Sequence, residues 1–230
     1  VNHDAFYVSH ALEPVRVPAQ ALVDGFLPPY APEHRLATEQ VESWGNVVTQ
    51  DMYWRHRQAI EEAMARVPQR LAEADREWRE RFGRGWGVVE RYRCEGADTV
   101  VVTMGSMCGT ARDAVDAMRE QGLDVGLLKL RLFRPFPARA LRAALAGVRE
   151  VVVLDRNHSP GAGGVLHQEL RAALFGAGRA PRGHRMQAEA SMQPAHHAGT
   201  RLGKGKERVP QQRTIGKDPQ MLRVMLRQQP

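Results

Sequence analysis

The first candidate for ligand chemistry is the turn at residues 105–110, GSMCGT, which follows the β-branched run TVVVTM and precedes a helical pattern. Backbone N–H groups at the start of a helix can bind an anion. Ser106 or Thr110 could instead cap that helix. The turn lacks both the glycine and lysine spacing of a Walker loop and the GxGxxG pattern. We predict a capped strand–helix connection, with an anion site as the alternative.

A second glycine-rich turn, SPGAGG at 159–164, follows the apolar run EVVVLDR. Carboxyl ends of parallel strands meet at one edge of a sheet, and open α/β folds bind ligands there. Seven residues are therefore candidates for cofactor binding, with local loop architecture as the alternative: Gly105, Ser106, Thr110, Arg134, Arg156, Gly161 and Gly163. Cys108 has no identified base beside it, and we expect a buried structural thiol. We identify no catalytic residue and no metal site.

Alternating elements must position these turns. Apolar runs typical of buried strands occur at 99–104, 124–133 and 150–156, with an extra edge strand at 90–95. Helical patterns occur at 110–121, 138–146 and 165–175. This alternation predicts an α/β domain with a mostly parallel sheet that helices cover on both faces.

The first 90 residues follow another pattern. We expect a strand end at 5–8, a short helix within 18–30, and a long connection over 31–49. A helix over 51–82 contains Pro68, which should kink or divide it near Val67. GRGWG then forms a flexible stop. Within the helix, YWRHRQ mixes aromatic and basic groups, as nucleic-acid binders do, but we expect one packed and one solvated face.

Composition limits the class of protein. The chain has 230 residues, of which 43% are hydrophobic, enough for one large or two small domains. No apolar run is long enough to predict a membrane span, and no secretory leader is evident. Two cysteines favour a reduced, cytoplasmic protein. The net charge of +7 arises at residues 179–230, which hold 11 Lys and Arg against three Asp and Glu.

Three segments together resemble a known family. They are DAFYVSHALEPVRVP, GSMCGTARDAVDAMREQGLDVGLLKLRLFRPFP and VVVLDRNHSPGAGGVLHQELRAAL. In this order they resemble the α subunit of pyruvate:ferredoxin oxidoreductase (pyruvate synthase) and of related 2-oxoacid:ferredoxin oxidoreductases. The resemblance implies a three-layer transketolase C-terminal-like domain at 96–178. It also implies the end of a thiamine-diphosphate pyrimidine-binding domain at 1–36, followed by a helical connection at 37–95.

The resemblance implies oxidative decarboxylation of pyruvate with CoA and ferredoxin. Thiamine diphosphate and magnesium would be bound at the level of the complex, and iron–sulfur clusters would lie on other subunits. The partners would be subunits of β, γ and δ types, with no membrane and no nucleic acid. No activating glutamate, substrate-binding side chain or cluster cysteine of the family maps onto this chain. We therefore expect it to support the site and to be inactive alone.

The segment at 179–230 departs from the family pattern. We expect one more strand after the helix at 165–175, but the sequence becomes basic and poor in apolar residues. A disordered tail, or a shifted reading frame, would explain this change. Loss of the strand would expose a sheet edge. The alternative function is a non-catalytic interaction module whose basic tail binds nucleic acid or an acidic partner.

Overall fold

The computed structural model describes residues 12, 14–39, 41, 43–45, 47–157, 159–176 and 186–190. They form two compact units. The helical unit comprises Leu12–Val88 and Phe133–Pro135, and the α/β unit comprises Val89–Leu132 and the described residues from Phe136 onward. The strand end predicted at 5–8 lies outside the described residues, as does the tail beyond 190.

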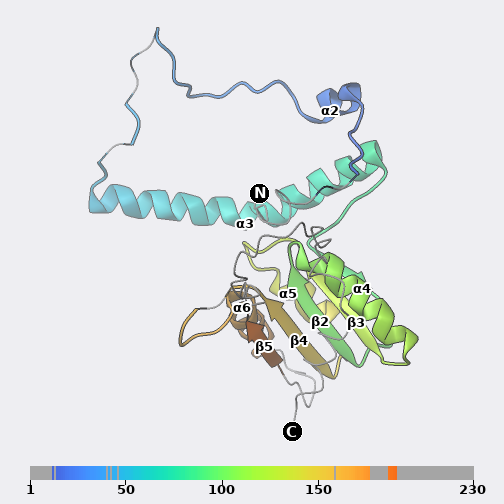
Figure 1. The fold of residues 1–230 in the computed structure, drawn as a ribbon. Coiled ribbons are helices and arrows are strands. Elements are labelled where there is room, and N and C mark those ends of the chain that lie inside the picture. The colour runs from blue at the N-terminus through green and yellow to red at the C-terminus, as the bar shows by residue number, and fades with distance from the viewer. Residues whose placement is uncertain are drawn as a thin grey trace, which may run out of the picture. The chain divides into compact units, whose positions relative to one another are not determined.

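The helical unit contains two helices, α2 (Gln20–Phe26) and α3 (Gln50–Phe82), as predicted (Figure 1). No helix or strand is assigned to the described residues between them. The rings of Trp78 and Phe82 on α3 meet the ring of Phe26 on α2 edge-on, with centroids 5.2 and 5.9 Å away. This aromatic cluster fastens α2 to the C-terminal end of α3.

Pro68 does not divide α3, which is one helix of 33 residues. Proline removes one backbone hydrogen bond from a helix interior. The residues around it are mainly Ala, Glu, Arg and Gln, all strong helix formers. Their propensity continues the helix across the missing bond, so α3 is not divided near Val67. The prediction also allowed a kink, and Figure 1 shows α3 changing direction along its length.

The stop after α3 is fixed rather than flexible. Gly83 ends the helix in the left-handed region, with φ of 71°. The carboxylate of Asp75 then accepts the backbone N–H groups of Trp86 and Gly87 at 2.6 and 3.1 Å. These hydrogen bonds hold the pKa of Asp75 below its usual value. The carboxylate thus binds the GRGWG segment back onto the helix.

The α/β unit is built on a five-stranded sheet with the order β1-β3-β2-β4-β5. Its strands are β1 (Val89–Tyr92), β2 (Thr99–Met104), β3 (Val125–Leu130), β4 (Glu150–Asp155) and β5 (Met186–Ala190). β1 is antiparallel to β3, and all other pairs are parallel. The predicted mostly parallel sheet and its extra edge strand are confirmed.

Three helices connect the parallel strands: α4 (Met107–Glu120), α5 (Ala138–Ala144) and α6 (Val165–Leu174). The chain leaves β2 toward β3 and then crosses back over β2 to β4. Right-handed crossovers in opposite directions place their helices on opposite faces. Figure 1 accordingly shows α4 on one face of the sheet, with α5 and α6 together on the other.

The fifth strand differs from the sequence-based expectation. β5 lies inside the segment predicted to be a tail, and it pairs with β4 from Val151↔Met186 to Asp155↔Ala190. Its sequence, MQAEA, has few of the β-branched residues that favour strands. Backbone pairing with the exposed edge of β4 supplies what local propensity does not, so the edge of β4 is covered.

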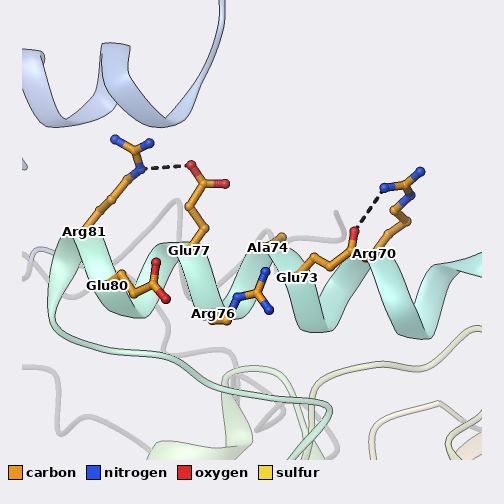
Figure 2. Close-up of a pocket in the computed structure, with 7 residues that line it drawn as sticks. All are labelled: Arg70, Glu73, Ala74, Arg76, Glu77, Glu80 and Arg81. Atoms are coloured by element: carbon orange, nitrogen blue, oxygen red, sulfur yellow. Dashed lines mark hydrogen bonds and ion pairs between the residues drawn. The ribbon is translucent and has the colours of Figure 1, made fainter.

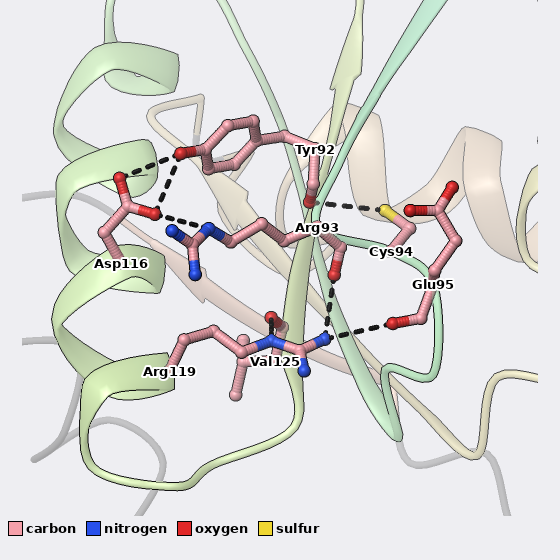
Figure 3. A network of polar contacts seen from close by, with 7 residues as sticks. All are labelled: Tyr92, Arg93, Cys94, Glu95, Asp116, Arg119 and Val125. Carbon is pink, nitrogen blue, oxygen red and sulfur yellow. Dashed lines mark hydrogen bonds and ion pairs between the residues drawn. The ribbon is translucent and has the colours of Figure 1, made fainter.

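The core on the α4 face is aliphatic. Buried side chains from the sheet and from α4 form one cluster: Val101, Val125, Leu127, Val152, Leu154, Ala111, Ala114, Val115 and Met118. Tyr92 packs against this cluster, and its hydroxyl donates to the carboxylate of Asp116 on α4 at 2.8 Å (Figure 3). The ring and the hydroxyl therefore join the edge strand β1 to the helix.

Arg119 on α4 links its helix to the start of β3 and to the turn after β1. Its Nε donates to the carbonyl of Val125 at 2.7 Å, at the start of β3. Its Nη2 donates to the carbonyls of Arg93 and Glu95 at 2.9 and 3.4 Å, in the turn after β1 (Figure 3). One guanidinium group therefore satisfies carbonyls of both the β1–β2 turn and β3.

Replacing Arg119 with alanine should lower the free energy of opening of the sheet by about 2 kcal/mol, because hydrogen bonds to a charged group contribute about 1.5–3 kcal/mol. Hydrogen exchange of the β3 amides in the full chain would measure the loss. The exposed neighbour Glu120→Ala is the control and should change the value by less than about 0.5 kcal/mol. Equal effects of both substitutions would contradict the assigned role.

Candidate functional site

The first candidate turn connects β2 directly to α4. Gly105 has φ of 72°, a region that favours glycine. The Cys108 N–H donates to the Gly105 carbonyl at 3.2 Å, so the helix starts at Met107, three residues earlier than predicted. Ser106 occupies the N-cap position but makes no side-chain capping hydrogen bond, and Thr110 lies inside the helix. The predicted caps are therefore wrong, since the left-handed glycine turn already begins the helix.

The second candidate turn closes on itself. The N–H groups of Ser159 and Gly163 donate to each other's carbonyls, both at 2.9 Å. Gly161 and Gly163 have φ of 79° and 83°. Glycine is needed here for the backbone of the turn. The backbone of this turn thus gives a structural reason for glycine at both positions, as the loop-architecture alternative expects.

Asp155, at the end of β4, organises the connection to α6. Its side chain is buried, and its two oxygens accept the N–H groups of Asn157 and Leu166 at 2.9 and 2.7 Å. The Leu166 N–H is one of the first in α6, which otherwise has no side-chain cap. A Cβ added at Gly164 would lie 2.6 Å from the Asp155 carboxylate. Asp155 is therefore the helix cap, and Gly164 leaves room for it.

The structure brings some of the predicted residues together and not others. β2 and β4 are neighbours, so the turn at 105–106 and the turn at 159–163 leave adjacent strand ends. The connection from β2 leads to β3 and the connection from β4 leads to β5, in opposite directions along the sheet, which makes the edge between β2 and β4 a topological switch point. Arg156 is exposed at the same edge. Thr110 lies on the surface of α4.

Arg134 belongs to the helical unit rather than to the sheet edge. Its guanidinium group lies 4.2 Å from the centroid of the Phe133 ring, and it donates to the Phe133 carbonyl at 3.1 Å. Contacts within its own segment therefore account for the position of this side chain.

An ion-pair cluster around the buried Lys129, near the end of β3, was not predicted. Lys129 is only 9% exposed, and its ammonium group lies 2.8 Å from Glu90, its register partner on β1. Arg131 also binds the Glu90 carboxylate. Burial alone would raise the pKa of Glu90, but the hydrogen bonds from both cations bring it below its usual value. The feature of the sequence that could have indicated this cluster is one basic residue, Lys129, within the otherwise apolar strand β3.

Cys108 lies half-buried within the first turn of α4. Burial raises the pKa of its thiol, although the positive charges of Lys129 and Arg131 act in the opposite direction. A raised pKa lowers the thiolate fraction and therefore the reactivity. The interpretation of Cys108 as a structural thiol fits this environment better than a role as a nucleophile.

A hollow along α3 carries many charges but no site. It is lined by Arg70, Glu73, Ala74, Arg76, Glu77, Glu80 and Arg81 (Figure 2). Arg70 pairs with Glu73 at 3.0 Å, and Arg81 pairs with Glu77 at 2.9 Å. Small-molecule sites are concave and mostly apolar. One charged helix face does not meet that description.

Within the described ranges, no group of three or more His, Cys, Asp or Glu side chains could hold a metal ion. No described helix is both long and apolar enough to cross a membrane.

Comparisons with known proteins decide the family. Residues 97–188 match the model of pyruvate:ferredoxin oxidoreductase core domain II. A pyruvate synthase subunit PorA from Methanothermobacter thermautotrophicus is 42% identical over 171 residues, 74% of this chain and 45% of the relative. The chain belongs to the pyruvate:ferredoxin oxidoreductase family. It spans less than half the length of the curated relatives it matches.

Relatives in this family carry different substrate names. A pyruvate synthase subunit PorA from Thermotoga maritima is 40% identical, over 76% of this chain and 45% of the relative. A ketoisovalerate oxidoreductase subunit VorA from Pyrococcus abyssi is 38% identical, over 79% of this chain and 46% of the relative. A solved 2-oxoglutarate:ferredoxin oxidoreductase from Magnetococcus marinus gives a TM-score of only 0.36 at 22% identity, covering 57% of this chain and 20% of that one.

The core domain II match covers the part of the α/β unit that runs from β2 to the first residues of β5. Both glycine turns, Asp155 and Cys108 lie within it. The match also extends ten residues beyond residue 178, where the sequence predicted the end of the domain. β5 accounts for that extension, since it completes the sheet.

Gly164→Ala should destabilise α6 by about 1–3 kcal/mol, because the added methyl group would collide with the buried Asp155 carboxylate. Gly109→Ala is the matched control. Gly109 lies inside α4 with no atom near an added Cβ, so this change should stabilise the helix by about 0.5–1 kcal/mol. Hydrogen exchange of the α6 and α4 amides would measure both. A neutral Gly164→Ala would refute the packing constraint.

Cys108 should react with iodoacetamide more slowly than free cysteine at pH 8, and its rate should rise only at a pH above the ordinary thiol range. The cause is the raised pKa of the thiol. Cys108→Ser would identify its share of the labelling measured by mass spectrometry. Reaction faster than that of free cysteine would revive the nucleophile interpretation.

Proposed function

We propose that this chain is the C-terminal part of the α subunit of a thiamine-diphosphate-dependent 2-oxoacid:ferredoxin oxidoreductase. The observation that carries the proposal is the 42% identity to a pyruvate synthase subunit over 74% of the chain. The α/β unit would be its transketolase C-terminal-like domain. The mostly parallel sheet between helices supports that assignment.

The proposed reaction converts pyruvate, CoA and oxidised ferredoxin into acetyl-CoA, CO2 and reduced ferredoxin. Pyruvate synthase subunits among the relatives support pyruvate as the substrate. A branched-chain oxoacid is the second candidate, because a ketoisovalerate oxidoreductase subunit is nearly as similar at 38% identity. The complex would also contain β-, γ- and δ-type subunits and act in the cytoplasm.

The described residues do not fit a thiamine diphosphate or magnesium site. The buried carboxylate of Asp155 is engaged by backbone N–H groups. Glu90 is engaged by Lys129 and Arg131. We therefore derive no chemical step through the cofactor on this chain. Its proposed role is to assemble and support a site whose thiamine diphosphate, magnesium and iron–sulfur clusters other parts of the complex hold.

The carboxyl edge of the sheet is the proposed contact of this domain with the rest of the enzyme. Gly105 and Ser106 would contribute from the first turn, and Arg156, Gly161 and Gly163 from the second. Adjacent strand ends at a topological switch point support this choice, because ligands and partners of open α/β sheets gather there. Thr110 and Arg134 have no comparable support.

Family membership favours a subunit of an oxidoreductase over the non-catalytic module with a nucleic-acid-binding tail. The family match ends at residue 188, so it includes little of the basic segment at 179–230. The tail beyond residue 190 lies outside the described residues.

The purified chain alone should show no pyruvate-dependent dye reduction with CoA, thiamine diphosphate and magnesium. The reason is that the carboxylates of Asp155 and Glu90, the two considered for such a site, are committed to structural contacts. A complete 2-oxoacid:ferredoxin oxidoreductase is the positive control in the same spectrophotometric assay. Turnover by the chain alone would contradict the supporting role and place reacting groups within it.

A further inference from the structure

Helix α3 carries an apolar stripe, the α3 seam, much of which no other described residue of the helical unit covers. The seam consists of Tyr53, Ile60, Met64, Val67 and Leu71. Their spacing of seven, four, three and four residues aligns them on one side of a helix. Every residue from 50 to 66 is exposed, and Tyr53 and Ile60 are 55% and 48% exposed. A solvent-facing stripe of this length marks an interaction surface.

The segment before α3, the arm at 27–48, exposes further apolar side chains. Tyr30 and Trp44 are 91% and 55% exposed, and the described aliphatic residues Leu36 and Val47 are also exposed. Trp54, beside the seam, is 69% exposed. The mixed YWRHRQ segment therefore has no packed face among the described residues, contrary to the sequence-based expectation. Aromatic side chains of this kind dominate the energetics of protein interfaces.

The exposed apolar side chains belong almost entirely to the helical unit. Of 19 large exposed hydrophobic residues in the described chain, only Leu123 and Phe175 lie in the α/β unit. The α/β unit buries its apolar side chains in its own core and offers no extended apolar face.

A second copy of the chain also fits poorly. Arg57 lies on the seam side of α3, four residues after Tyr53 and three before Ile60. Pairing two seams would bring two Arg57 guanidinium groups together with no acidic seam residue to pair with them, whereas a different protein can supply a carboxylate. Such a helix pair would also leave the arm uncovered.

We propose that the α3 seam and the arm bind the remainder of the α subunit, the part that relatives carry beyond the region this chain matches. This chain matches only 45% of the most similar relatives' length. The unmatched part of these relatives is longer than the matched part, and it would be supplied on the same or a separate polypeptide. The seam thus deepens the proposed function, because it names the surface that joins this chain to its enzyme.

The test is co-expression of the full 230-residue chain with the unmatched part of the Methanothermobacter thermautotrophicus PorA subunit. Light scattering after size-exclusion chromatography should show a one-to-one complex. Met64→Glu places a charge in the seam and should weaken binding about tenfold or more. Ala65→Glu adds the same charge about 100° around the same helix and should weaken it less than about twofold.

Three results would overturn the inference. They are no complex with the unsubstituted chain, equal weakening by both substitutions, and a homodimer of the chain alone that Met64→Glu dissolves. Circular dichroism should show equal helix content in both variants, because glutamate is a good helix former. The readout is binding rather than turnover. Turnover is not expected of this pair, because the proposed reaction also needs the β-, γ- and δ-type subunits, so failure of the proposed reaction in a complete complex would leave this inference standing.

Discussion

The central position of β2 is the constraint on which the α/β unit depends. Val100, Val101 and Val102 are fully buried, and β2 is hydrogen-bonded on both sides, to β3 and to β4. Because the chain moves from β2 to one neighbour and then crosses to the other, right-handed connections must place α4 opposite α5 and α6. The sheet order, the two helical layers and the switch point at the carboxyl edge all follow from this one strand.

The sequence predicted this arrangement well because its information is local. The β-branched run before Gly105 is a strand by composition alone, and alternation with helices implies parallel pairing. The contacts of Arg119 and Asp155 were not predictable in the same way. Arg119 reaches the carbonyl of Arg93, 26 residues away, and Asp155 reaches the N–H of Leu166, 11 residues away. Neither spacing belongs to a periodic pattern.

Errors of prediction arose where tertiary structure overrides local preference. Thr110 was a candidate cap, yet α4 already starts at Met107. β5 has a weak strand sequence, but it pairs with the edge of β4. Pro68 was expected to kink or divide a helix that its flanking residues continue. In each case a neighbouring element or segment supplies the stabilisation that the local sequence lacks.

The turn at 105–110 shows why a family can be identified without a site. Its glycine sets the backbone, its serine makes no capping bond, its cysteine is half-buried and its threonine faces outward from α4. Backbone conformation and helix position therefore describe this turn, and no ligand is needed to explain them. The turn carries the chain from a buried strand into a covering helix. Such a path identifies a fold family closely, while the chemistry depends on residues that meet it from elsewhere.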